Sequence, residues 1–123
     1  MGKFAIQRVR GGYQFGLRAG NGQNVATSRV FLTMNDCLRA IEWVRKHADA
    51  PVSDRSAGDA PERFCAERYQ IYRCADGRMG FCLLDGRGDA VLRSEGYTAK
   101  RSCRIGIASI GSNAPDALVA GCP

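Results

Sequence analysis

Apolar residues alternate with small or polar ones in three short stretches at the start of the chain. They stand at Phe4 and Ile6, then at Tyr13, Phe15 and Leu17, and then at Val25. A period of two is typical of a half-buried strand, because successive side chains of a strand point to opposite faces. The turn-forming pairs Gly11-Gly12 and Asn21-Gly22 separate the three stretches. The first part of the chain therefore predicts three strands joined by hairpins.

The spacing of the apolar residues changes to that of a helix after Phe31. The apolar positions are now Cys37, Ile41 and Val44. Their spacing of i, i+4 and i+7 places them on one helical face. Thr33, followed three residues later by Asp36, resembles a capping box and predicts where the helix begins. Trp43 is displaced by one position from the stripe, so we expect it at the edge of the core rather than in a ligand site.

The same order of elements recurs later in the chain. A shift of 66 residues gives nine identities over the 36 positions from Tyr13 to Ala48. The identical pairs are Phe15 and Phe81, Leu17 and Leu83, Gly20 and Gly86, Gly22 and Gly88, Val25 and Val91, Ser28 and Ser94, Cys37 and Cys103, Ile41 and Ile107, and Ala48 and Ala114. Upstream, a shift of 65 residues aligns Phe4 with Tyr69. The chain is thus a duplicated β-β-β-α unit, in which Thr98 is the nearest candidate to cap the second helix.

The duplication predicts the α+β class. We expect two tandem β-β-β-α(-β) repeats that pack into one compact body, with an antiparallel sheet and both helices on one face. The predicted first repeat spans residues 1–48, a flexible linker rich in Pro, Ser, Gly and Ala spans 49–62, the second repeat spans 63–120, and 121–123 form a tail. A chain of about 50 residues buries too little apolar surface to be very stable alone. We therefore expect a monomer in which the two repeats form one cooperative unit.

Three segments resemble the YegP-like family of small bacterial domains of unknown function. They are residues 21–28 (Asn-Gly-Gln-Asn-Val-Ala-Thr-Ser), residues 94–100 (Ser-Glu-Gly-Tyr-Thr-Ala-Lys), and residues 106–110 leading into Asn-Ala-Pro at 113–115. The resemblance covers residues 3–48 and 68–115. The first copy departs from the family at residues 39–43, where Arg-Ala-Ile-Glu-Trp replaces the usual Gly-Ile-x-Ser. It departs again at Leu32, where the family has Thr or Ser.

The resemblance implies how the repeats associate. In this family a repeat has three strands, a helix and a short final strand that joins the sheet of the partner repeat, either within one chain or between subunits. Residues 64–66 and 118–120 are the candidates for these final strands. The family brings no established catalytic residue, cofactor or ligand, so none is transferred to this chain.

The six cysteines and the single histidine do not form a metal-binding or catalytic pattern. No C-x-x-C pair is present, whereas zinc sites use closely spaced Cys and His ligands. Cys37 and Cys103 occupy equivalent positions on the apolar stripes, so we expect buried, reduced thiols there. Cys37 and His47 are ten residues apart on one helix, which separates them by about 15 Å. We predict no catalytic residue, no cofactor site and no metal site, and therefore no enzymatic activity.

Basic residues exceed acidic ones by 18 to 12, which gives a net charge of +6. Such an excess favours solubility and weak attraction to anions. Our first hypothesis is a cytoplasmic, non-enzymatic accessory module that binds an unidentified protein partner. The alternative is weak, sequence-independent binding of nucleic acid through surface arginines, with Lys100, Arg101 and Arg104 as the candidate contacts. We expect no membrane association, since the chain contains no run of about 18 apolar residues.

Overall fold

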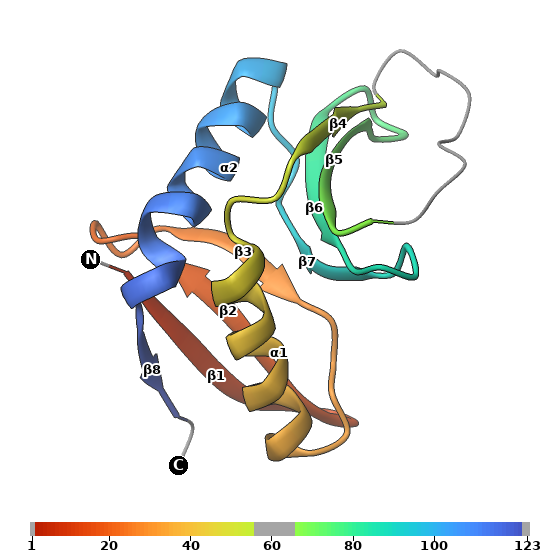
Figure 1. Cartoon of the computed structure of the whole chain (residues 1–123). Helices are drawn as coiled ribbons and strands as arrows, with labels where there is room; N and C mark the ends of the chain where they lie inside the picture. The colour runs from red at the N-terminus through yellow and green to blue at the C-terminus, as the bar shows by residue number, and fades with distance from the viewer. Residues whose placement is uncertain (1, 56–65, 122–123) are drawn as a thin grey trace.

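The computed structural model describes residues 2–55 and 66–121 (Figure 1). The strands are β1 (Lys3–Val9), β2 (Gly12–Arg18), β3 (Asn24–Ser28), β4 (Val52–Asp54), β5 (Arg68–Arg73), β6 (Met79–Leu84), β7 (Ala90–Arg93) and β8 (Leu118–Ala120). The helices are α1 (Met34–His47) and α2 (Lys100–Asn113), and a 3-10 turn, η1 (Ala114–Asp116), follows α2. The order β-β-β-α-β therefore occurs twice, as the internal repeat predicts.

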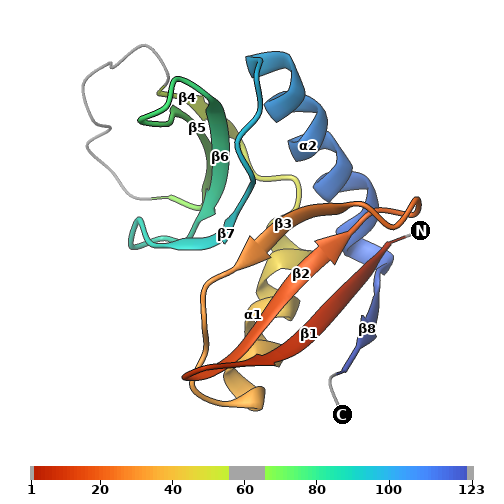
Figure 2. The ribbon, with the colours of Figure 1, turned by 180° about the vertical axis from the view of Figure 1, so that it is seen from behind.

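The strands of the described residues form one sheet in the order β4-β5-β6-β7-β3-β2-β1-β8. The six inner strands pair antiparallel, as predicted, and the two outer strands pair parallel to their neighbours. Strands β3 and β7 join the two halves through the pairs Thr27–Arg93 and Ser28–Leu92. The sheet turns sharply at this junction, so that its two halves face different directions (Figure 2).

Each outer strand comes from one repeat and pairs with the other. Strand β4 follows α1 of the first repeat and pairs with β5 of the second, while β8 follows α2 and pairs with β1 (Figure 1). The final strand of the second repeat lies where it was expected, but that of the first does not. Of the expected residues 64–66, the structure describes Ala66, which belongs to no strand, and the strand is instead Val52–Asp54, inside the segment expected to be a linker.

One hydrophobic core joins the two repeats. The predicted helical stripes are buried at Cys37, Ile41, Val44, Cys103, Ile107 and Ile110. The alternating strand positions bury Phe4, Ile6, Phe15, Leu17, Tyr69, Ile71, Phe81 and Leu83. All of these side chains belong to a single cluster, which confirms the predicted apolar faces. In the part of the chain that the structure describes, neither helix is long and apolar enough to cross a membrane.

The C-terminal ends of α1 and α2 are each bonded by the other repeat. The Tyr69 hydroxyl donates to the carbonyl oxygen of Ala48 at 2.7 Å, at the end of α1. Phe4 occupies the position equivalent to Tyr69 and has no hydroxyl. Instead, the Arg45 guanidinium lies 5.2 Å from the centroid of the Phe4 ring and donates to the carbonyl oxygen of Ala114 at 3.2 Å. Two different side chains thus bond equivalent carbonyls at the ends of the two helices, and the Ala114 carbonyl also accepts from the Ala117 N–H at 3.3 Å.

The two helices begin differently although their positions are equivalent. Thr33 caps α1 as predicted, since its Oγ1 accepts a hydrogen bond from the Asp36 N–H at 3.0 Å. The N-cap of α2 is Ala99, which makes no side-chain bond, so the prediction that Thr98 caps this helix was wrong. The 66-residue shift places Thr33 on Ala99, and Thr98 therefore lies one residue too early to reach the free N–H groups.

Replacing Ala99 with threonine is expected to raise the free energy of unfolding by about 1 kcal/mol. The backbone of Ala99 has φ −140° and ψ 147°, close to the −127° and 155° of Thr33. The Ser102 N–H donates to the Ala99 carbonyl at 3.1 Å, and the new hydroxyl would add an acceptor beside it, as Thr33 Oγ1 does for the Asp36 N–H. Urea denaturation followed by circular dichroism measures the change. Ala99→Val is the control, because valine has the same branched shape without the hydroxyl. Equal stability of the two variants would contradict the prediction.

Candidate functional site

The serines of the repeat signature hold the backbone together. The Ser28 hydroxyl accepts from the Phe15 N–H at 2.9 Å and donates to the carbonyl of the following residue at 2.7 Å. The Ser94 hydroxyl makes the equivalent bonds, with the Phe81 N–H and with the following carbonyl, both at 2.9 Å. Each hydroxyl is engaged where β3 or β7 ends. The resemblance to the family at these positions therefore reflects structural residues rather than a nucleophile.

The buried cysteines have the environment of hydrophobic residues. Cys37 and Cys103 are 0% exposed, as predicted. Burial raises the pKa of the Cys103 thiol, and burial also raises the pKa of Cys82 although the Arg93 and Arg68 guanidinium groups oppose that shift. A raised thiol pKa leaves less of the nucleophilic thiolate at neutral pH. Within residues 2–55 and 66–121, no group of three or more His, Cys, Asp or Glu side chains is placed to hold a metal ion.

The three basic residues predicted to contact nucleic acid lie in the first turns of α2, and two of them are paired. Lys100 Nζ lies 2.8 Å from Asp54 Oδ2, and Arg104 Nη2 lies 3.7 Å from the same oxygen. Arg101 is exposed to solvent. Asp54 belongs to β4, so its carboxylate connects the last strand of the first repeat to the helix of the second. This pairing reduces the positive charge that the helix presents to an anionic partner.

We expect any binding of nucleic acid to be weak, electrostatic and blind to sequence. The affinity should fall with salt, with a slope of log affinity against log salt of about −0.9 per phosphate contact. Fluorescence anisotropy with unrelated DNA and RNA oligomers at two salt concentrations measures this. Arg101→Gln should weaken the binding more than Lys100→Gln, because Asp54 already neutralises Lys100. Tight binding that persists at high salt and prefers one sequence would contradict the expectation.

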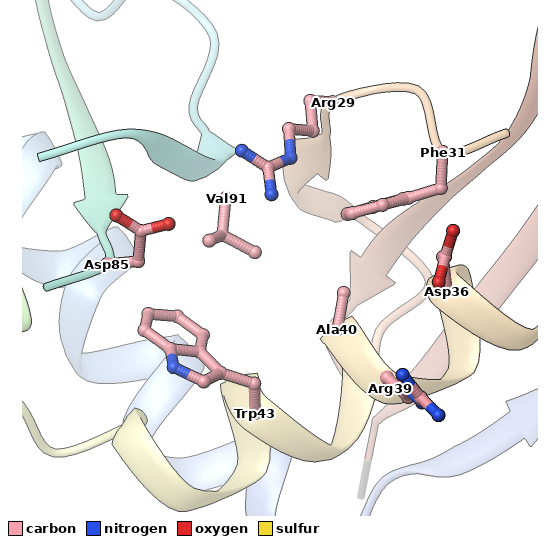
Figure 3. A pocket seen from close by; sticks show the side chains of 8 residues that line it. All are labelled: Arg29, Phe31, Asp36, Arg39, Ala40, Trp43, Asp85 and Val91. Carbon is pink, nitrogen blue, oxygen red and sulfur yellow. The ribbon is translucent and has the colours of Figure 1, made fainter. Parts of the chain in front are cut away.

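A pocket of about 370 Å³ lies where the helix of the first repeat meets the second half of the sheet (Figure 3). The first repeat contributes Arg29, Phe31, Asp36, Arg39, Ala40 and Trp43. The second repeat contributes Asp85 and Val91. We call this the Trp43 pocket. Its volume falls within the range of small-molecule sites, about 300–1,000 Å³.

Arg29 and Trp43 project into this space from the end of β3 and from α1 (Figure 3). The Arg29 Cζ lies 5.2 Å from the centroid of the Phe31 ring. The half-buried Trp43 indole stacks on the His47 imidazole, with ring centroids 4.4 Å apart, and His47 Nδ1 lies 2.9 Å from the Trp43 carbonyl oxygen. Trp43 packs against the core, as expected. Trp43 also lines a pocket, whereas the sequence analysis expected no ligand site at this residue.

The duplication produces a second, equivalent pocket of about 310 Å³. The second repeat contributes Tyr97, Ser102, Ile105, Gly106 and Ser109. The first repeat contributes Ala19, Asn21, Gln23, Asn24 and Val25. We call this the Ser109 pocket. The 66-residue shift aligns the two linings as Phe31 with Tyr97, Asp36 with Ser102, Arg39 with Ile105, Ala40 with Gly106, Trp43 with Ser109, Asp85 with Ala19 and Val91 with Val25.

The two pockets share a frame and differ in chemistry. Ser109 stands where the first pocket has Trp43, so an aromatic wall is replaced by a small hydroxyl. Glu95 stands at the position equivalent to Arg29, so the charge at that position is reversed. The fold therefore accepts a small side chain and the opposite charge at these two positions. The departure of residues 39–43 from the family pattern was the signal in the sequence for this difference.

Comparisons with known proteins agree with the duplicated architecture. A family model described as a domain of unknown function (DUF1508) matches residues 9–54 and 75–120. The UPF0339 protein in the ptx operon 5′ region of Stutzerimonas stutzeri is 30% identical over 119 residues, which cover 96% of this chain and 94% of that protein. A UPF0339 protein of Treponema denticola is 37% identical over 54 residues, which cover 44% of this chain and 93% of that protein.

The fold is also that of a solved relative. The solution NMR structure of YegP from Escherichia coli, a protein of unknown function, matches with a TM-score of 0.78 at 22% identity and covers 98% of this chain and 91% of that one. The first matched segment of the family model ends at Asp54, the last residue of β4, and the second ends at Ala120, the last residue of β8. Each matched segment thus begins at or after the end of the first strand of its repeat and includes the exchanged strand, and the chain belongs to the DUF1508 family of domains of unknown function.

Proposed function

We propose that the protein is a non-enzymatic module that binds a small ligand through the Trp43 pocket. The divergence of two equivalent pockets supports the proposal. Arg29 and Trp43 line one pocket, whereas Ser109 lines the other and Glu95 stands at the sequence position equivalent to Arg29. The architecture does not need a guanidinium or an indole at these positions. Arginine and tryptophan are among the residues that contribute most to recognition. Both repeats supply walls, so one chain can form the pocket, and we propose that the module acts as a monomer in the cytosol.

The chemistry around the pocket suits binding better than catalysis. Of the residues that line it, none is cysteine, serine or histidine. The nearby His47 imidazole stacks on Trp43 and bonds to the backbone of its own helix. The Ser28 hydroxyl is held between two backbone groups. These arrangements fix the walls of a pocket and do not pair a nucleophile with a base.

A ligand screen on the full chain tests the proposal. Small anionic, cationic and neutral compounds are added to ¹⁵N-labelled protein, and amide shifts are mapped onto the two pockets. At least one class of compound should shift the amides of Arg29, Phe31 and Trp43, and should change the fluorescence of Trp43, the single tryptophan. Trp43→Ala should abolish the shifts, and Ser109→Ala should leave them unchanged. Shifts confined to the Ser109 pocket, or no shifts with any class, would contradict the proposal.

A further inference from the structure

The position of Arg29 is fixed by its backbone, and within residues 2–55 and 66–121 its guanidinium has no acidic partner. Its N–H donates to the Val91 carbonyl at 3.3 Å, and its own carbonyl accepts from the Ser28 hydroxyl at 2.7 Å. The side chain therefore starts from a constrained point at the junction of β3 and β7. Among the described residues, no carboxylate lies within 4.0 Å of this guanidinium, whose contact is the Phe31 ring. Such a group offers parallel N–H donors to a planar anion.

The two carboxylates of the pocket have other roles. Asp85 Oδ1 accepts from the Arg87 N–H at 2.9 Å and from the Asp89 N–H at 3.0 Å, within the turn between β6 and β7. Asp36 lies in the first turn of α1, where a negative charge interacts favourably with the helix dipole. Neither carboxylate lies within 4.0 Å of the Arg29 guanidinium nitrogens, so neither occupies the place of a ligand anion there.

The walls beside Arg29 suit a flat ring. Trp43 supplies most of the aromatic surface, since Phe31 is only 9% exposed beneath the Arg29 guanidinium, and Ala40 and Val91 supply small apolar surface between the two rings (Figure 3). The His47 imidazole supports the indole by stacking on it, which limits the motion of the ring before a ligand arrives. Aromatic pairs prefer offset or edge-to-face packing, which these two walls offer to a third ring.

We infer that the ligand of the Trp43 pocket is a small compound with a planar ring and a carboxylate or phosphate group, with the anion on Arg29 and the ring against Trp43 and Phe31. This inference rests on the proposed function and adds the ligand class. The Ser109 pocket supplies the contrast, because no arginine lines it and Ser109 would offer no ring. The same chemistry fits an aromatic carboxylate and a mononucleotide, so the experiment separates them.

The test compares each anion with a neutral analogue on the full-length protein. Phenylacetate is titrated against phenylacetamide, and adenosine 5′-monophosphate against adenosine, with amide shifts of the pocket residues giving each Kd. At least one anion should bind tenfold or more tightly than its neutral analogue. The pair that shows the larger ratio identifies a carboxylate or a phosphate as the preferred group.

Variants assign the effect to the two side chains. Arg29→Gln should reduce the preference for the anion to less than threefold, whereas Glu95→Gln, the matched change in the other repeat, should retain it. Trp43→Ser introduces the residue found at the equivalent position 109, and it should raise the Kd of the ring compounds at least tenfold. Thermal unfolding checks that the three substitutions, including the one at half-buried Trp43, leave the fold intact.

Two outcomes separate this inference from the proposed function. The inference would be overturned if neutral or cationic ring compounds bound in the pocket as tightly as the anions, or if the anion preference persisted in Arg29→Gln. The proposal that the protein is a binding module would not be affected by either result. No shift of any pocket amide with any compound would overturn both.

Discussion

Neither half of the chain is expected to fold alone as a monomer. Residues 1–55 would lack β8, the strand that pairs with β1, and residues 66–123 would lack β4, the strand that pairs with β5. Each half would also lose the partner of a helix end, since Tyr69 bonds Ala48 and Arg45 bonds Ala114. A chain of this size with half of a shared core is too small for independent stability. The expected effect is loss of cooperative folding.

Circular dichroism, NMR and sedimentation of each half measure this prediction. The monomeric halves should show poorly dispersed amide signals and no cooperative thermal transition. The control is the pair of halves expressed together, which should associate and restore one transition because all strand pairings are then present. A single half with sharp, dispersed signals at monomer mass would contradict the prediction.

A folded homodimer of one half would agree with the same reasoning. The final strand of each repeat pairs with the first strand of the other repeat, β1 or β5. In a homodimer of one half, the first strand of the second copy offers the same free edge. The Treponema denticola relative matches this chain over 93% of its own length with 54 aligned residues, about one repeat. We expect a one-repeat chain to complete its sheet in the same way, by pairing with a second copy.

The sequence predicts those helices and strands in which several apolar residues recur at the spacing of a helix or a strand. Each helix shows three stripe residues at helical spacing, and all six are buried. The inner strands show period-two alternation beside glycine turns, and Gly22, Gly77 and Gly88 have the positive φ that those turns require. These signals are local and repeated. They therefore identify elements before any tertiary contact is known.

The features that were missed depend on contacts between the repeats. Strand β4 has three residues, too few for a visible alternation, and it exists because β5 offers a free edge. Continuing the 66-residue shift past Ala48 would have found it, since Val52–Asp54 aligns with Leu118–Ala120. The Trp43 pocket combines α1 with Asp85 and Val91, which lie more than forty residues away in the sequence. No local pattern brings these residues together.

Placing aspartate on the buried stripe of either helix is expected to lower the free energy of unfolding by about 4 kcal/mol or more. Ile41 is 0% exposed and Ile107 is 8% exposed, and both lie in the cluster that contains Phe81. Ile41→Asp and Ile107→Asp each remove a packed side chain and bury a carboxylate in its place. The stability of a domain is about 5–15 kcal/mol, so either variant should be largely unfolded at moderate urea concentration.

The matched control for this last prediction lies on the same helix. Ile105 on α2 is 62% exposed, so Ile105→Asp makes the same substitution at a position outside the core. It should alter the free energy of unfolding by less than about 0.5 kcal/mol. Urea denaturation of the three variants and the parent measures the difference. If Ile107→Asp unfolds at the same urea concentration as Ile105→Asp, the face of α2 assigned to the core is wrong, and with it the shared core that makes one unit of the two repeats.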